Sequence, residues 1–258
     1  MQDLSYKEKH DRLAVRIRAH KEFANFDIDE WIVGFLTRRR RQSIFDLGCG
    51  NGNHLHLYLD SVGSQGRVAA LDREAALIDQ AKSRYGDVGN LDLRIGSMDA
   101  PLPFADGSFD TSFSNFAIYN AGDPAVTLGE LKRTLQPGGE VVLIGPTINN
   151  ARELYAFNER LTGKAIDDVT LIRTDRLRRE IVPLARAIFG EVREEVINSH
   201  LNFPSAEEFL RYYMATMLYE EGAEKEGRTL VEMHAALCAE NPLILSKEML
   251  AVIARGSA

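Results

Sequence analysis

Residues 44–53, "IFDLGCGNGN", place three glycines within five positions directly after a short apolar run. A strand, a glycine-rich turn and a helix in this order open a doubly wound α/β sheet, where ligands bind beyond the carboxyl ends of the strands. In a dinucleotide-binding turn, G-x-G-x-x-G, the third glycine counted from Gly48 would fall at position 53, which is Asn. No Gly-Lys-Ser or Gly-Lys-Thr follows either. The turn therefore argues against a pyrophosphate or a phosphate-loop ligand.

The acidic residue Asp46 stands at the end of the same apolar run. A carboxylate at this position would repel a phosphate and attract a cation. S-adenosylmethionine has a suitable head, because it carries an ammonium and a sulfonium and no phosphate. The stretch is thus interpreted as holding the amino-acid end of that molecule.

Short apolar runs alternate with helical stretches from residue 43 to residue 145, which predicts a parallel sheet with helices on both faces. The strand-like runs are "SIFDL", "GRVAALD", "LDLRI", "FDTSFS" and "EVVLIG", and a "QPGGE" turn precedes the last of them. Two further strands are expected over residues 191–203 and 247–255. The predicted fold is α/β: a Rossmann-like, seven-stranded, mostly parallel sheet, with N-terminal helices and a helical insertion between the last two strands.

The flanking segments are expected to be mainly helical. We expect two N-terminal helices parted near "NFD", a helix over residues 149–163 capped by Asn, a helix split at Pro183, a helix capped by Ser205, and a helix over about 225–239. Three parts are predicted: residues 1–42, whose helices cover the cofactor site; the core, 43–145; and the rest of the sheet, 146–258, with a substrate-recognition or lid insertion at about 205–240.

Composition excludes several functional classes. The 258 residues carry a net charge of −7, which disfavours nucleic acid as a partner. No apolar run is long enough to span a bilayer and the N-terminus is polar, so a cytoplasmic location is expected. Cys49 and Cys238 form no metal-ligand pattern, and no metal is expected.

The arginines at 38–41 are interpreted as a solvated helix cap, with an RNA or anionic-substrate patch as the alternative. Oligomeric state stays open, a homodimer included.

Several motifs in order carry a resemblance to a known family. "FDLGCGNG" resembles the first motif of the class I S-adenosylmethionine-dependent methyltransferases, and "VAALDRE", "LRIGSMDAPLPF", "FADGSFDTSFSNFAIYN" and "LKRTLQPGGEVVLIGP" resemble the segments that follow it. The resemblance covers residues 43–145 and is close to the ubiquinone and menaquinone biosynthesis type. It implies transfer of a methyl group from S-adenosyl-L-methionine to an O, N or C atom of a small molecule, leaving S-adenosyl-L-homocysteine.

The resemblance also implies a set of cofactor-binding residues. Asp72, 24 positions past Gly48, would accept the ribose hydroxyls, and Asp99 would accept the adenine amino group with Met98 against the ring. Asn115 and Phe116, at the end of the fourth strand, would face the methionine moiety. The full set is Asp46, Gly48, Cys49, Gly50, Asp72, Arg73, Ser97, Met98, Asp99, Asn115 and Phe116.

The methyl acceptor has no recognisable motif. A general base is needed only where the nucleophile must lose a proton, and the candidates are His200 and Tyr119. The candidate substrate contacts are Tyr6, Asn120, Tyr155, Tyr212 and Tyr213. Two alternatives remain open: an RNA (tRNA) methyltransferase using the arginines at 38–41 and 173–179, and a non-catalytic regulatory module that binds S-adenosylmethionine.

Overall fold

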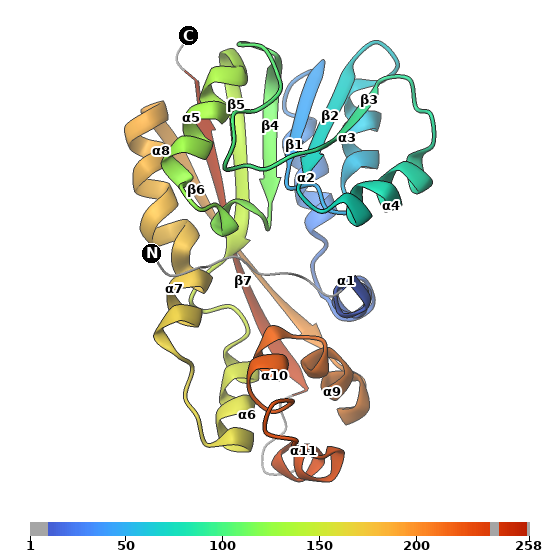
Figure 1. The fold of residues 1–258 in the computed structure, drawn as a ribbon, viewed down its shortest axis with the longest axis vertical. Helices are drawn as coiled ribbons and strands as arrows, with labels where there is room; N and C mark the ends of the chain where they lie inside the picture. The colour runs from blue at the N-terminus through green and yellow to red at the C-terminus, as the bar shows by residue number, and fades with distance from the viewer. Residues whose placement is uncertain (1–9, 238–242, 257–258) are drawn as a thin grey trace.

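The computed structural model describes residues 10–237 and 243–256. They form one seven-stranded sheet in the order β3-β2-β1-β4-β5-β7-β6 (Figure 1). Its strands are β1 (Ser43–Leu47), β2 (Arg67–Asp72), β3 (Leu91–Ile95), β4 (Phe109–Asn115), β5 (Leu135–Pro146), β6 (Glu191–Asn202) and β7 (Ile244–Arg255). Neighbours among β1 to β5 pair in parallel, and β7 lies antiparallel between β5 and β6. The predicted mostly parallel α/β sheet is confirmed.

Helices cover both faces of the sheet. Successive side chains of a strand point to opposite faces, so the apolar residues of the central strands need a cover on each face. Ile44 and Val142 point to the face that α2 (Ile28–Leu36) and α3 (Leu55–Val62) cover. Phe45 and Val141 point to the other face, toward α5 (Pro124–Thr134) and α8 (Val182–Phe189). All five residues of β1 are buried, and the predicted apolar run lies inside the sheet between β2 and β4.

A second packed unit lies beyond the carboxyl ends of the parallel strands, and we call it the aromatic lobe. It consists of α1 (His10–Phe23), α6 (Arg152–Thr162), α9 (Ala206–Met214), α10 (Met217–Glu221), α11 (Leu230–Leu237) and the extensions of β6 and β7 past the end of β5 (Figure 1). Its core stacks Phe157 edge-on against Phe209 and Tyr213. Helices α9 to α11 form the predicted insertion between the last two strands.

Two local predictions are wrong for tertiary reasons. Helix α6 was expected to begin at an Asn cap, but its N-cap is Ala151, in the left-handed region at φ 61° and without a side-chain hydrogen bond. The amide of Asn149 donates instead to the Glu248 carboxylate at 3.1 Å. The "QPGGE" turn lies inside β5, where Gly138 adopts φ 70° and the register with β4 shifts.

Other helix boundaries agree with expectation. Ser205 caps α9, its Oγ accepting from the Glu208 N–H at 3.4 Å. Pro183 is the second residue of α8, and the preceding turn, η2 (Leu177–Ile181), widens into a π-helix that joins α7 (Asp168–Arg176) to α8. A proline has no N–H for the helical ladder, which accounts for the irregular turn before it. Within the described ranges no helix is long and apolar enough to cross a membrane.

Candidate functional site

The glycine turn between β1 and α3 requires glycine for two reasons. Gly48, Gly50 and Gly52 have φ values of 77°, 55° and 78°, a region that L side chains rarely adopt. A Cβ on Gly48 would also lie 2.4 Å from the Cβ of Ala117. A Cβ on Gly50 would meet no atom within 4 Å. The turn is therefore packed tightly at Gly48 against Ala117, two residues after the end of β4, and is open at Gly50, where a ligand can approach the backbone.

Three polar side chains converge on one face at the carboxyl ends of β1, β2 and β4. Asp46 is the register partner of Ala70 on one side and Phe113 on the other. Two positions further along those strands stand Asp72 and Asn115, which therefore share the face of Asp46. This is the edge at which doubly wound sheets bind ligands.

Asp46 is the buried acid of the site. It is 2% exposed, and within the described residues its carboxylate accepts no hydrogen bond. Burial raises its pKa to about 7, the nearby Asp72 charge raises the pKa further and His54 lowers it. A charged carboxylate held out of water without a partner is costly, so this position favours a cation.

Asn115 is held so that one of its acceptors stays open. Its Nδ2 donates to the Tyr58 hydroxyl at 2.7 Å, and the Tyr58 ring stacks on Phe113 at 4.7 Å between centroids. Its Oδ1 is buried and accepts no hydrogen bond from the described part of the chain. Asn115 and Asp46 thus present two acceptors that lack donors.

Asp72 ties the glycine turn to the end of β2. Its Oδ2 accepts from the Gly50 N–H at 2.8 Å and its Oδ1 from the Glu74 N–H at 2.9 Å. Each oxygen of a carboxylate has a further lone pair, so both remain able to accept from a ligand. The next residue, Arg73, forms an ion pair with Glu74, with 3.4 Å between the Arg73 Nε and the Glu74 Oε1.

The segment after β3 approaches the turn from the neighbouring strand. The Ser97 Oγ accepts from the Asp99 N–H at 3.1 Å, and the Asp99 Oδ1 accepts from the Gly122 N–H at 2.7 Å. The Met98 Cε would lie 3.4 Å from a Cβ on Gly48, so its side chain borders the turn. Asp99 is exposed, and its second carboxylate oxygen remains open to a ligand. Cys49, in the glycine turn, is partly buried, and burial raises the pKa of its thiol.

A strained residue follows β4. Phe116 has φ 54°, a rare conformation for a bulky side chain, and is 37% exposed. The short helix η1 (Ile118–Asn120) comes next and is held by Arg176, which donates to the carbonyls of Tyr119 at 3.0 Å and Ala121 at 2.5 Å. Arg176 is 4% exposed. Its burial removes this arginine from the phosphate contacts of the RNA alternative, and no sequence signal distinguishes it from the exposed Arg179.

The remaining candidates lie apart from the turn. Tyr119 packs against the core beside Gly145, and the hydroxyl of Tyr155 lies 3.4 Å from that of Thr174. Asn120 closes η1. Tyr212 and Tyr213 are both buried in the aromatic lobe, where Tyr213 donates to Asn158 and Lys247 donates to Tyr212.

His200 lies on the extension of β6 opposite Ser246. The strand register aligns Glu195 of β6 with Asn115, which ends β4 at the carboxyl edge of the sheet. His200 lies five positions further along β6, about 16 Å from Glu195. Tyr6 and Cys238 lie outside the described residues. No group of three or more His, Cys, Asp or Glu suited to a metal occurs among residues 10–237 and 243–256.

Comparison with known proteins places this geometry in a family. Residues 39–176 match the family described as "Methyltransferase domain". An uncharacterised 37.1 kDa transposon protein of Streptomyces fradiae is 33% identical over 157 residues, 58% of this chain and 44% of that protein, so the match spans less than half of that relative's length. The demethylmenaquinone methyltransferase of Staphylococcus aureus is 28% identical over 214 residues, covering 80% of this chain and 78% of that enzyme.

The solved structures agree on the fold. A putative methyltransferase from Bacillus halodurans superposes with a TM-score of 0.60 over 88% of this chain and 99% of that one, at 14% identity. The family match includes the glycine turn, Asp72, Asp99 and Asn115. The chain belongs to the methyltransferase domain family, and within it to the class I S-adenosylmethionine-dependent methyltransferases.

Proposed function

We propose that this chain transfers a methyl group from S-adenosylmethionine to a small molecule, and that the site at the carboxyl edge holds the cofactor. The observation that carries the proposal is the pair of donor-less acceptors, the Asp46 carboxylate and the Asn115 Oδ1. An ammonium offers three N–H donors and a positive charge, which is what these two groups lack. When bound, S-adenosylmethionine supplies a methyl group activated by a positive sulfur.

The other residues of the site fit the rest of the cofactor. Asp72 has lone pairs left for two ribose hydroxyls, and its bond to Gly50 fixes the open side of the turn. Asp99 keeps one oxygen for an exocyclic amine, with Met98 beside it as an apolar surface. Ser97, Arg73, Cys49 and Gly48 shape the backbone around these groups. Asp46 and Asp72 lie close enough for the charge of Asp72 to raise the pKa of Asp46, and two neighbouring acids attract a cationic ligand and repel a phosphate.

The acceptor side is proposed to be the aromatic lobe and the residues that border it. The lobe lies beyond the carboxyl ends of the strands, and α1 packs against α9 and β6 within it (Figure 1). Phe116 and Asn120 follow the carboxyl end of β4, the edge beyond which this lobe lies, and Arg176 fixes the turn that carries Asn120. These residues would align the acceptor and exclude water, the main requirement of an in-line displacement.

A small molecule is favoured over RNA by two features. A curated relative matched over 214 residues is a demethylmenaquinone methyltransferase. Two of the arginines that RNA contact would use are engaged within the protein, since Arg176 is buried and Arg179 pairs with Asp175 at 2.6 Å. Tyr119 and His200 stay proposals as bases, and the position of His200 requires that the acceptor reach the extension of β6.

Cofactor binding is tested by calorimetric titration with S-adenosylmethionine and S-adenosylhomocysteine. Asp46→Asn and Asp72→Asn are expected to weaken binding at least tenfold, because each removes a charge-assisted contact. Asp60→Asn, an exposed acid on α3 outside the site, is the matched control. Wild-type binding that is absent, or unchanged in both site variants, would overturn the cofactor site.

The acceptor is tested with S-adenosylmethionine carrying an isotope-labelled methyl group. The enzyme is incubated separately with small-molecule extract below 1 kDa, with a panel of quinols and phenols, and with transfer RNA. Label in the small-molecule fraction supports the proposal. Label in the RNA selects the nucleic-acid alternative, and cofactor binding with no transfer to any fraction selects the regulatory one.

A further inference from the structure

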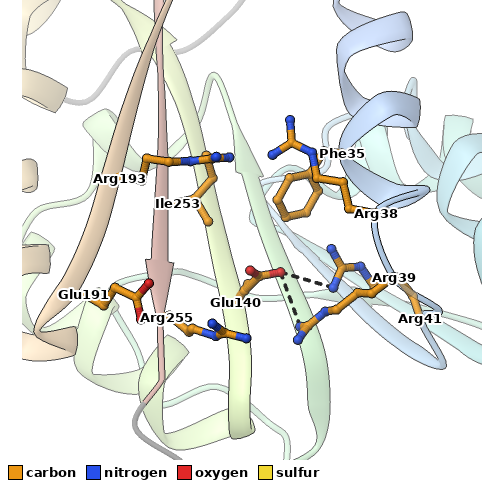
Figure 2. Close-up of a pocket in the computed structure, with 9 residues that line it drawn as sticks. All are labelled: Phe35, Arg38, Arg39, Arg41, Glu140, Glu191, Arg193, Ile253 and Arg255. Atoms are coloured by element: carbon orange, nitrogen blue, oxygen red, sulfur yellow. Dashed lines mark ion pairs between the residues drawn. The ribbon is translucent and has the colours of Figure 1, made fainter.

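A second concave surface lies at the opposite edge of the sheet from the glycine turn, and we call it the arginine hollow. Its volume is about 320 Å³, and it is lined by Phe35, Arg38, Arg39, Arg41, Glu140, Glu191, Arg193, Ile253 and Arg255 (Figure 2). The residues Glu140, Arg255 and Glu191 form one row across β5, β7 and β6. Along β5 this row is four positions, about 13 Å, from Ile144 at the cofactor edge.

The charge of the arginine hollow is opposite to that of the whole chain. Five arginines face two glutamates there, an excess of three positive charges, whereas the chain carries −7. Glu140 is already shared, because its carboxylate lies 3.4 Å from Arg39 and 3.2 Å from Arg41. Figure 2 shows the guanidiniums of Arg193 and Arg255 extending from the β6 and β7 side toward the arginines of the segment after α2. Like charges gathered in this way repel unless an anion lies between them.

The guanidinium of Arg41 is buried without a full set of acceptors. It is 1% exposed, its Nε donates no hydrogen bond within the described ranges, and its Nη1 lies 3.2 Å from the Glu140 Oε2 as an ion pair without hydrogen-bond geometry. The group lies over the ring of Phe35 at 4.8 Å, with Arg38 over the same ring at 5.5 Å. Stacking of this kind leaves the N–H groups at the guanidinium edge open to an acceptor, and buried donors without one are unfavourable.

Three further guanidiniums that line the arginine hollow are available to bind an anion. In the part of the chain that the structure describes, those of Arg38 and Arg255 have no hydrogen bond or carboxylate partner, and Arg193 only approaches Glu195 at 4.0 Å. Arg39 differs, because it donates to the carbonyls of Gly138 and Asp110 and so ties the segment after α2 to β4 and β5. The arginine hollow therefore has a fixed base and several unused donors.

We propose that the arginine hollow binds a compact anion with at least two negative charges on phosphate oxygens, such as the diphosphate group of a small molecule. The planar fork of a guanidinium matches two oxygens of one phosphate, and the arginines of the segment after α2, of β6 and of β7 line one concave volume. An extended nucleic-acid backbone requires a basic track, whereas these arginines gather around a single hollow. The site is separate from that of the cofactor.

Calorimetry with pyrophosphate at constant ionic strength tests the proposal. One equivalent is expected to bind to the wild type, with the same affinity in the presence of saturating S-adenosylhomocysteine. The double variant Arg193→Gln/Arg255→Gln is expected to bind at least tenfold more weakly, and its affinity for S-adenosylhomocysteine is expected to be unchanged. Both arginines are exposed, so the variant is expected to fold, which a thermal melt verifies. Arg211→Gln, an exposed arginine on α9, is the matched control.

Three results would overturn the assignment. Pyrophosphate that produces no more heat than sodium chloride at equal ionic strength means that no site exists. Equal binding by the wild type and the double variant places the anion elsewhere. A 20-nucleotide RNA that binds at least tenfold more tightly than pyrophosphate, and loses that affinity in the double variant, assigns the hollow to nucleic acid instead.

Discussion

Replacing Asp46 with asparagine is expected to make the ligand-free protein more stable and the cofactor complex weaker. Burial raises the pKa of Asp46 from 3.8 to about 7, so the native state binds a proton more tightly than the unfolded chain does. Stability therefore falls as pH rises between about 4 and about 7, and the full cost persists above pH 7. Each pH unit corresponds to about 1.4 kcal/mol, which gives a cost of about 4 kcal/mol for the charged carboxylate.

Asparagine keeps the shape of the side chain and cannot ionise. Asp46→Asn is thus expected to exceed the wild type at pH 8 by up to about 4 kcal/mol in free energy of unfolding, or roughly 10 °C in melting temperature, and to match it near pH 4. Urea and thermal unfolding of the ligand-free proteins at both pH values measure this difference. Asp60→Asn, which changes an exposed acid on α3, is expected to show no such pH dependence.

The same substitution separates stability from cofactor binding. Losing a charge-assisted contact to an ammonium is expected to cost about 1.5–3 kcal/mol, roughly 10- to 150-fold in the dissociation constant for S-adenosylmethionine. Wild-type affinity is expected to fall below pH 7, by no more than about tenfold per pH unit, as Asp46 takes up a proton. A variant that is less stable than the wild type at pH 8, or that binds the cofactor equally well, would refute the reasoning.

Three further substitutions test the neighbouring contacts. Gly48→Ala places a Cβ 2.4 Å from that of Ala117 at φ 77°, and urea unfolding is expected to show a loss of at least about 2 kcal/mol that Ala117→Gly only partly restores. Tyr58→Phe leaves the buried amide of Asn115 without its acceptor, which should cost about 1–3 kcal/mol and shift cofactor titrations. Arg176→Met should lower kcat with the S-adenosylhomocysteine affinity unchanged; an unchanged kcat contradicts its positioning role.

The sequence predicted those parts of the fold that depend on local pattern. The run "SIFDL" has the bounds of β1, and "LDLRI" those of β3, because apolar alternation and flanking glycines are properties of a few neighbouring residues. The failure at α6 has the opposite origin. The side chain of Asn149 is taken by Glu248, 99 positions away, and no local pattern reports such a contact.

The site divides in the same way. Gly48, Asp72 and Asp99 are predicted as cofactor contacts because each belongs to a motif that directly follows a strand, and the structure describes all three at the carboxyl edge of the sheet. Tyr58 and Arg176 carry no such signal, since one is an aromatic residue on an amphipathic helix and the other stands in a run of arginines whose exposure differs residue by residue. The sequence indicates only part of the arginine hollow: the run at residues 38–41 is local, whereas Arg193 and Arg255 join it through the register of β6 with β7.

The pair formed by β6 and β7 has a mechanical consequence. All twelve residues of β6 pair with β7, and the two strands run without a break from the arginine hollow to the aromatic lobe. A lobe attached through loops can swing as a rigid body, but one that shares two continuous strands with the sheet can move only by twisting a hydrogen-bonded ribbon. Access to the acceptor side is thus expected to come from shifts of individual helices, and amide exchange should be slow along the ribbon and faster in those helices.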